Sequence, residues 1–312
     1  RNTQNSCPSF MLTLDGRPDE QHGMVIGGTL AWSGNFRLNF EVDEFNVLNI
    51  LAGVNPYASD YTLAKGESFT TPEMIYTHSF RGAGGASRNL HDWARNYGVW
   101  HGHVPTPTLL NSWEGAAFSF DAKTLTDMID DAAAMGLEMF VLDDGWFGNK
   151  YPRNNSNAGL GDWQVNAAKL PEGIDHIASY AHSKGLKFGI HLMRGLPKIA
   201  AEKKLPVKGT NGITCDMIAS NDSACTWLRD NYKVDYRKPG AQEYYNSCFE
   251  LYAEWGVDFV KIDDLSRPYH TAEIEMIRKA IDHCGRPIVL SISPGETPLE
   301  KVEHVKTHAN MW

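Results

Sequence analysis

Two different hydrophobic patterns divide the chain near residue 104. Up to about residue 100, short runs of aromatic and β-branched residues are broken by Gly, Asn and Asp, as in GTLAWSGNFRLNFEVDEFNVLNI and AKGESFTTPEMIYTHSF. This pattern is typical of antiparallel strands. The segment SRNLHDWARNY is predicted to be helical and is followed by the linker HVPTPTLL. Since proline disfavours helical backbone in the residue before it, we predict one domain in residues 1–104 and a second in 105–312.

From residue 105 on, short apolar runs alternate with amphipathic segments. The predicted strands are TLLNSW, LEMFVLDDGW, LKFGIHLM, VDFVKI and RPIVLSI, and ANMW begins a sixth. Between them lie predicted helices such as DAKTLTDMIDDAAAMG, with apolar residues at helical spacing and Gly136 as its stop. A stretch from roughly 195 to 238 is expected to be irregular. Alternation of this kind predicts an α/β fold with a parallel sheet covered on both faces.

Two parallel architectures fit this alternation, a doubly wound sheet and a (β/α)8 TIM barrel. No glycine-rich phosphate loop follows the first strand, TLLNSW, which disfavours the nucleotide-binding form of the doubly wound sheet. We therefore expect a (β/α)8 barrel of which this chain contains about six of the eight strands.

Composition and charge limit the kinds of molecule that the chain is expected to bind. The 312 residues carry 38 acidic and 29 basic side chains, a net charge of −9. This balance argues against nucleic-acid binding, which needs clustered Lys and Arg, and suits a neutral substrate. No run of 18 apolar residues is present, so no membrane span is expected.

Cysteine and histidine positions bear on metals and disulfides. The five cysteines are widely spaced and include no CxxC, so a thiolate zinc site is not expected. Cys215 and Cys225 share one predicted loop and could form a disulfide in an oxidising compartment. A metallohydrolase would need several histidines at strand ends, where only His191 lies clearly and His270 and His308 are less certain. We predict no metal and no cofactor.

Polar residues recur at the carboxyl ends of the predicted strands. In a barrel these ends meet at one face, where the chemistry lies. Scattered surface polarity would not repeat at one edge, so we interpret the set as a site. Its members are Trp113, Glu114, Asp143, Asp144, His191, Arg194, Lys261, Asp263, Asp264 and Ser293.

Two Asp-Asp motifs carry the candidate chemistry. In VLDDGW, Asp143 and Asp144 suit hydrogen bonding to sugar hydroxyls, although helix capping or a turn would also explain them. In VKIDDL, Lys261 and Asp263 are two residues apart and share one strand face. A carboxylate beside an ammonium stays ionised and can act as a nucleophile. A structural salt bridge is the alternative, and Asp264 offers a competing carboxylate.

Several segments resemble the α-galactosidases of glycoside hydrolase family 36 and the related family 27. LLNSWEG, FVLDDGWFG and GLGDWQVNAAKLPEG resemble the family 36 barrel, and GTLAWSGNF and GESFTTPE resemble the end of its N-terminal β-sandwich domain. From the third strand on, HLMRG, KIDDL, SRPYH and SPGETP look more like bacterial relatives nearer family 27.

The resemblance implies a retaining, exo-acting α-galactosidase that needs no cofactor and cleaves α-galactoside oligosaccharides. Asp263 matches the nucleophile and Lys261 the lysine that hydrogen-bonds the galactose ring. Asp143 and Asp144 match the pair that binds the 4- and 6-hydroxyls. The remaining substrate-binding candidates are the matched aromatic walls and four strand-end residues, namely Trp113, Trp146, His191, Arg194, Asp264 and Ser293.

The family's acid/base is an Asp shortly after the sixth strand, which places it beyond Trp312. The 312-residue chain by itself is therefore expected to be inactive. An α-N-acetylgalactosaminidase on the same scaffold, a non-catalytic carbohydrate-binding protein and a zinc hydrolase are the alternatives. The compartment (bacterial cytoplasm, periplasm or outside the cell) and homo-oligomer formation by the full-length enzyme are left open.

Overall fold

The computed structural model describes residues 6–312, except residues 18, 33, 58, 99–101, 158, 161, 162 and 226. Gly161 and Asp162 of the segment GLGDWQVNAAKLPEG thus lie outside the described residues. The chain divides into two compact units, Arg1–Pro105 and Thr106–Trp312, and each is described by itself.

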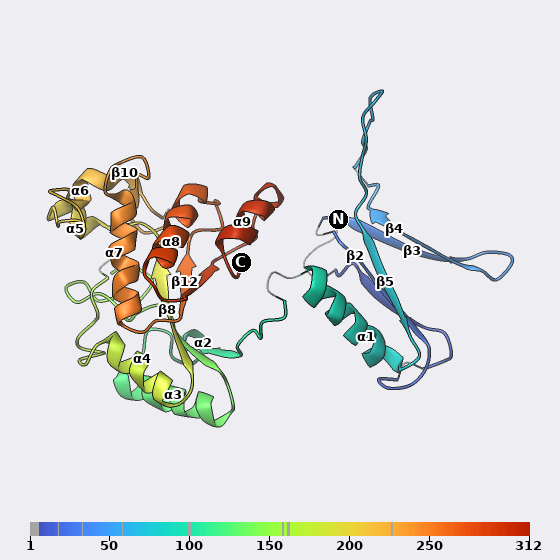
Figure 1. The fold of residues 1–312 in the computed structure, drawn as a ribbon, viewed down its shortest axis with the longest axis horizontal. Coiled ribbons are helices and arrows are strands. Elements are labelled where there is room, and N and C mark those ends of the chain that lie inside the picture. The colour runs from blue at the N-terminus through green and yellow to red at the C-terminus, as the bar shows by residue number, and fades with distance from the viewer. Residues whose placement is uncertain are drawn as a thin grey trace. The chain divides into compact units, whose positions relative to one another are not determined.

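The first unit consists of antiparallel strands and one helix (Figure 1). Its strands are β1 (Ser9–Thr13), β2 (Val25–Leu30), β3 (Phe36–Val42), β4 (Leu48–Val54) and β5 (Met74–Ser79). They form a three-stranded sheet in the order β1-β2-β5 and a separate β3-β4 pair. The antiparallel strands expected from the sequence are confirmed.

Helix α1 (Gly82–Trp93) begins well before the predicted SRNLHDWARNY segment and runs on into a π-helical turn, Ala94–Gly98. Glycine disfavours helices, so the GAGG start gives no helical signal in the sequence. Close packing against the backbone explains why glycine occupies this start of the helix. Gly82 has φ +64°, and a Cβ there would collide with the carbonyl oxygen of Asp19.

The second unit contains a five-stranded parallel sheet in the order β13-β12-β8-β7-β6. Its strands are β6 (Leu109–Asn111), β7 (Met139–Leu142), β8 (Lys187–Met193), β12 (Phe259–Asp263) and β13 (Val289–Ile292). The helices are α2 (Trp113–Ala116), α3 (Ala122–Ala134), α4 (Ile174–Ser183), α7 (Ala241–Glu254), α8 (Thr271–His283), a 3-10 turn η2 (Leu299–Lys301) and α9 (Val302–His308). The expected alternation of strands and helices is confirmed.

Local signals explain why these elements start and stop where they do. In α3, the Asp121 carboxylate caps the first turn by accepting from the backbone N–H of Thr124 at 2.8 Å. Leu125 and Ile129 are buried on its inner face, and Gly136 follows with φ +77°. Strand β7 is buried at all four positions, as expected for a strand covered on both faces.

The stretch from 195 to 238 is more regular than the sequence predicted. It contains β9 (Leu196–Pro197), α5 (Lys198–Glu202), α6 (Cys215–Ile218), β10 (Ala219–Ser223) and β11 (Asn231–Val234). The three strands form a small antiparallel sheet in the order β10-β11-β9. These strands are short, and β10 has an irregular register, so they leave no periodic pattern in the sequence.

The parallel sheet is the first part of a (β/α)8 barrel. Strand β6 lies at one edge, and at the other a parallel bridge joins Ser291 of β13 to Met311. Met311 thus begins the expected sixth strand. The large hydrophobic cluster lies entirely in this unit, between sheet and helices.

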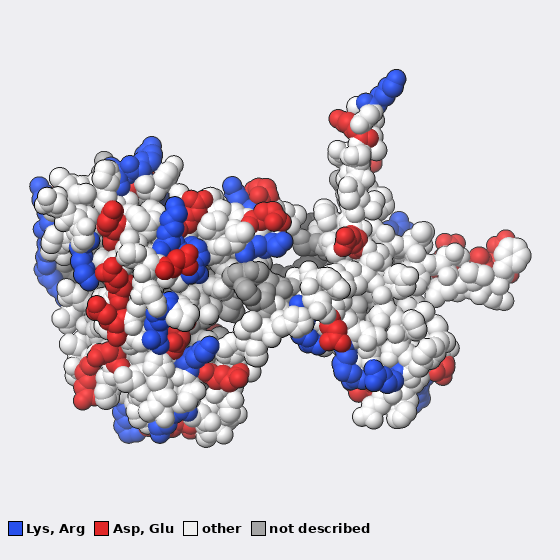
Figure 2. All heavy atoms as spheres, viewed as in Figure 1, with Lys and Arg blue, Asp and Glu red and all other residues white. Residues whose placement is uncertain are grey.

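Cys215 and Cys225 are both free and buried, so the disulfide considered from their spacing is not formed. None of the helices among the described residues has the length and apolar character that crossing a membrane requires. Acidic and basic side chains intermingle over the face of the barrel unit drawn in Figure 2.

Candidate active site

The alternation of side chains along β8 and β12 places the candidate residues on one face of the sheet. Lys261 pairs in register with His191 on β8 and with Ser291 on β13. Successive side chains in a strand point to opposite faces, so His191, Lys261 and Asp263 share the inner face. Leu192 and Ile262 consequently point toward the helices.

Lys261 lies between the two candidate carboxylates. Its Nζ donates to Oδ2 of Asp143 at 3.0 Å and lies 3.8 Å from Oδ1 of Asp263. Burial opposes the charge on this amine, but Asp263 and Asp143 outweigh burial and raise the pKa of Lys261. The side chain therefore stays cationic and joins the ends of β7 and β12.

Asp143 is buried and almost fully hydrogen-bonded. Its Oδ2 also accepts from Asn111 Nδ2 at 2.7 Å, and its Oδ1 accepts from the backbone N–H of Asp144 at 2.8 Å. Its own backbone N–H donates to Ser112 Oγ at 3.0 Å. Burial would raise the pKa of Asp143, but the charges of His191 and Lys261 and these hydrogen bonds lower it. The carboxylate is thus ionised and held in one orientation.

Asp144 is held by Arg153, a residue that the sequence did not indicate. Arg153 Nε lies 3.1 Å from each carboxylate oxygen of Asp144, and a second guanidinium nitrogen lies 2.8 Å from Oδ2. The arginine side chain is only 2% exposed. A two-pronged contact of this kind fixes orientation as well as charge.

Asp263 has one oxygen held and one free of hydrogen bonds. Oδ2 lies 3.2 Å from His191 Nε2, whereas Oδ1 has no hydrogen-bond partner among the described residues. Burial would raise the pKa of Asp263, but the hydrogen bond and charge of His191, then Lys261 and Ser293, lower it. Burial would lower the pKa of His191, yet Asp263 and the two β7-end aspartates raise it.

Asp264 lies in a different environment. Its φ of +65° places it in the left-handed region, where a non-glycine residue is uncommon. Burial, and to a lesser extent the charge of Asp263, raise its pKa, while the charge of Arg194 and then Trp227 partly offset them. Asp264 therefore turns out of the strand and is the harder of the two carboxyls to ionise.

The structure does not bring every predicted residue to the surface of the site. Trp146 is completely buried, and its Nε1 donates to the carbonyl oxygen of His191 at 2.9 Å. Arg194 is 4% exposed and forms an ion pair with Glu273 at 2.7 Å. Trp146 thus supports β8 from behind, and Arg194 holds the start of the 195–238 stretch.

Two predicted residues lie at the rim. Trp113, at the start of α2, is half-buried, and its ring packs edge-on against Phe118 at 5.0 Å. Ser293 directly follows β13 and is among the groups that lower the pKa of Asp263. Both therefore lie at the carboxyl ends of strands, as expected.

Trp227, from the 195–238 stretch, is an aromatic residue that the sequence reasoning missed. It is 54% exposed, helps to lower the pKa of Asp264, and its ring lies 5.6 Å from the Arg153 guanidinium carbon. Because it follows no strand of the parallel sheet, no strand-end signal could have identified it.

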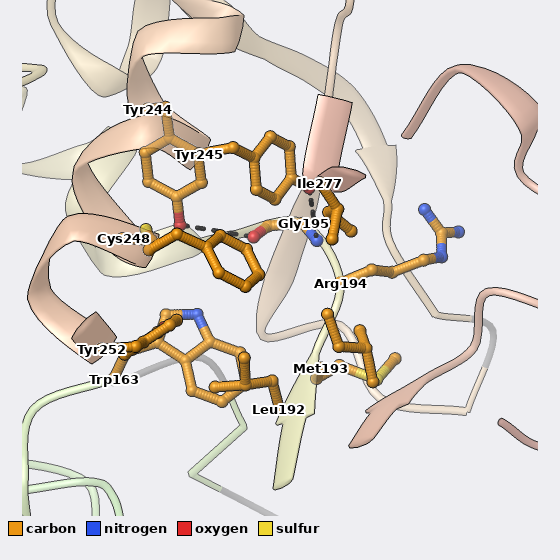
Figure 3. Close-up of a pocket in the computed structure, with 12 residues that line it drawn as sticks. Trp163, Leu192, Met193, Arg194, Gly195, Tyr244, Tyr245, Cys248, Tyr252 and Ile277 are labelled. Carbon is orange, nitrogen blue, oxygen red and sulfur yellow. Dashed lines mark hydrogen bonds between the residues drawn. The ribbon is translucent and has the colours of Figure 1, made fainter. Parts of the chain in front are cut away.

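A separate small cavity lies on the helix side of the same strands (Figure 3). Its volume is about 20 Å³, and Leu192 and Ile262 are among its lining residues. Tyr244 Oη donates to the carbonyl oxygen of Gly195 at 3.3 Å, and the Gly195 N–H donates to Tyr245 Oη at 3.3 Å. A space of this size holds about one water molecule, so it is a packing cavity and not a sugar site.

Comparison with known proteins identifies the class of protein that this barrel and its strand-end carboxylates define. The melibiase family model matches residues 68–290, and the N-terminal domain model of glycosyl hydrolase family 36 matches residues 2–64. The chain therefore belongs to the melibiase family, and its resemblance to family 36 is confirmed.

The relatives agree with this placement. The chain is 36% identical over 251 residues to a bifunctional alpha-galactosidase/sucrose kinase from Mediterraneibacter gnavus, covering 74% of this chain and 26% of that protein. It is 37% identical over 184 residues to an alpha-galactosidase from Geobacillus stearothermophilus, covering 58% and 25%. The chain thus spans about a quarter of the length of these curated relatives.

A solved family 27 structure is also similar. It is a β-L-arabinopyranosidase from Geobacillus stearothermophilus, 38% identical, with a TM-score of 0.60 over 72% of this chain and 54% of that chain. This likeness agrees with the family 27 character of the segments from the third strand on.

Proposed function

We propose that the complete protein is a retaining α-galactosidase that removes terminal α-linked galactose, with Asp263 as its nucleophile. The observation that carries this proposal is the asymmetry of the Asp263 carboxylate. Oδ2 is held by His191, while Oδ1 has no hydrogen-bond partner among the described residues and lies 3.8 Å from the Lys261 ammonium. An ionised oxygen without a hydrogen bond keeps its lone pairs available for attack.

The proposed reaction has two displacements. Asp263 Oδ1 attacks the anomeric carbon, a covalent bond forms, and the glycosidic C–O bond breaks as a carboxylic acid protonates the leaving oxygen. That acid, now a carboxylate, then takes a proton from water, whose oxygen attacks the same carbon and releases Asp263. Following the family resemblance, we place the acid beyond Trp312, about 5–5.5 Å from Asp263 in the complete barrel.

Asp143, Asp144 and Lys261 are proposed to hold the sugar. Their fixed orientations support this role, because groups already locked by protein contacts lose little freedom when a ligand arrives. For the aromatic wall we propose Trp113 and the exposed Trp227, since Trp146 has no exposed surface. No cofactor is needed for this chemistry, and homo-oligomer formation stays a prediction.

Two related sugars are alternative substrates to α-galactosides. An α-N-acetylgalactosaminide carries a bulkier group at C2, and a β-L-arabinopyranoside has the ring of galactose without its hydroxymethyl group. The second deserves a direct assay because of the 38% identity to a β-L-arabinopyranosidase. A carbohydrate-binding protein without catalysis is the remaining alternative.

The test is a substrate panel on the natural full-length protein with product analysis by proton NMR. We expect the highest kcat/KM on the nitrophenyl α-galactoside and α-galactose as the first product. Preference for the arabinopyranoside or the acetamido sugar would change the substrate but keep the mechanism. First-formed β-galactose would contradict a retaining mechanism, and galactose binding without turnover would leave only a binding protein.

A further inference from the structure

A group of metal-ligand side chains lies away from the candidate active site, on the outer helices of the barrel unit. Glu275 comes from α8, and His304 and His308 come from α9, which packs against α8 (Figure 1). One ligand atom from each residue lies within 4.8 Å of the others. None of these residues belongs to the set that surrounds Asp263.

The two histidines are four residues apart and therefore share one face of α9. Their rings are stacked, with centroids 4.0 Å apart and an interplanar angle of 12°. His304 Nε2 lies 3.3 Å from Glu275 Oε1. Two imidazoles and a carboxylate thus lie close together, and a turn of the stacked rings about their side-chain torsions aims both ring nitrogens at one ion.

Contacts on the far side of each ring orient these ligands. Nδ1 of His308 lies 2.8 Å from the carbonyl oxygen of His304 and 2.8 Å from the Thr307 hydroxyl oxygen. A carbonyl can only accept, and a hydroxyl can accept as well, so we assign the proton to this nitrogen. Its Nε2 is then left with the lone pair. Nδ1 of His304 lies 2.7 Å from Tyr269 Oη, which can accept in the same way. Metal-bound histidines characteristically donate their other N–H to an oxygen of this kind.

The contact between His304 and Glu275 suits a cation. Nε2 of His304 lies 3.3 Å from Oε1 of Glu275, so without an ion the imidazole donates its proton to the carboxylate. Neutral imidazole binds metals through a ring nitrogen that has lost its proton, and an ion at this point takes the place of that proton.

We propose that Glu275, His304 and His308 bind one transition-metal ion, with Zn²⁺ the best match. Imidazole and carboxylate ligands suit zinc, whereas Ca²⁺ and Mg²⁺ prefer all-oxygen sites. Three protein ligands leave the fourth tetrahedral position to water. The ion links α9 to α8, so its role is structural and separate from the sugar chemistry.

Calorimetric titration of the natural full-length protein with ZnCl₂ after EDTA treatment and dialysis tests the site. We expect one tight zinc ion per chain, lost in His304→Ala/His308→Ala. The control is Glu172→Ala/His176→Ala, which removes an exposed Glu–His pair at 2.9 Å on and beside α4 and should keep the tight ion. A wild-type protein that binds no zinc, or a double variant that binds it equally well, would overturn the proposal.

Two milder variants guard against loss of folding. Tyr269→Phe keeps the ring but removes the oxygen that orients His304, and we expect zinc affinity to fall about tenfold. His308→Gln should abolish the rise in melting temperature that zinc gives the wild-type protein, with circular dichroism confirming the fold. An equal zinc-dependent rise in wild type and His308→Gln would refute the site.

Discussion

Two strands of the barrel unit end in the same dipeptide, Asp-Asp, and the structure gives the two pairs opposite characters. At the end of β7, Asp143 and Asp144 are both buried, and each carboxylate is held by protein groups. At the end of β12, Asp263 has one oxygen without a hydrogen bond to any described residue, and Asp264 turns away with φ +65°. The same dipeptide thus forms a pair with both carboxylates held at β7 and a pair with unlike carboxylates at β12.

The difference comes from neighbours on other strands. The β7 pair faces cationic and amide donors at close range, which satisfy its oxygens before any ligand arrives. In the β12 pair, His191 contacts Asp263, where it holds one carboxylate oxygen and lowers the pKa. A pair fixed in advance suits recognition, and a carboxylate with a free oxygen suits bond formation.

The largest expected effect comes from Asp263→Ala. Removing the nucleophile should lower kcat on the nitrophenyl α-galactoside by at least about 10⁴-fold. Azide should fit the space left by the carboxylate and partly restore turnover, giving β-galactosyl azide as the product. If Asp263→Ala retained a large share of wild-type activity, Asp263 would not be the nucleophile, and Asp264 would be the next candidate.

Substitutions in the β7 pair should weaken sugar binding more than they slow the chemical step. Asp143→Asn should weaken galactose binding roughly 10–100-fold, because a charged hydrogen-bond acceptor becomes neutral. Asp144→Asn should also weaken binding, and in addition destabilise the fold by about 3–5 kcal/mol, because the buried Arg153 guanidinium loses the charge of the Asp144 carboxylate. Calorimetry with galactose measures the first effect and urea unfolding the second. Unchanged affinity in both variants would leave these residues only a structural role.

Much of this arrangement was predictable from the sequence, and the limits have physical causes. The shared face of Lys261 and Asp263 follows from strand alternation alone. By contrast, the Lys261–Asp143 and His191–Asp263 contacts join residues 118 and 72 positions apart. Contacts of that range depend on strand order and register, which no local pattern encodes.

Trp146 shows the same limit at short range. It lies two residues after Asp144, and its match to the family suggested a pocket wall. Gly145, with φ +104°, turns the chain there, and the indole packs behind β8 instead. Trp227 takes an exposed position through a stretch that the sequence analysis treated as irregular.

A pH profile of kcat/KM tests whether His191 keeps the Asp263 carboxylate ionised. The pKa of Asp263 is lowered in the folded protein, so its carboxylate stays ionised to a lower pH than that of an ordinary aspartate, whose pKa is about 3.9. His191→Asn removes the hydrogen bond and the charge that lower this pKa, and the acid limb of kcat/KM should move to higher pH. An unmoved limb would mean that His191 does not set the ionisation of Asp263.

Asp264→Asn should change kcat by less than about tenfold, if Asp263 alone is the nucleophile. Asparagine tolerates the left-handed backbone conformation as aspartate does, so this variant removes charge without straining the turn. It is therefore the matched control for both Asp263→Ala and His191→Asn. A loss comparable with that of Asp263→Ala would show that the two carboxylates act together.

Chelation should have the smallest effect on catalysis. It also tests the strand-end site and the proposed zinc site on α8 and α9 independently of each other. EDTA should leave kcat unchanged, because the proposed displacements use only carboxylates. If zinc links α8 to α9, chelation should still lower the melting temperature by a few degrees, since each kcal/mol shifts it by about 2–4 °C in a domain of this size. Assays and calorimetric scans on the same samples, with zinc and after EDTA, give both answers. Activity lost to EDTA and restored by zinc would revive the metallohydrolase alternative, whereas a constant melting temperature would count against the helix site alone.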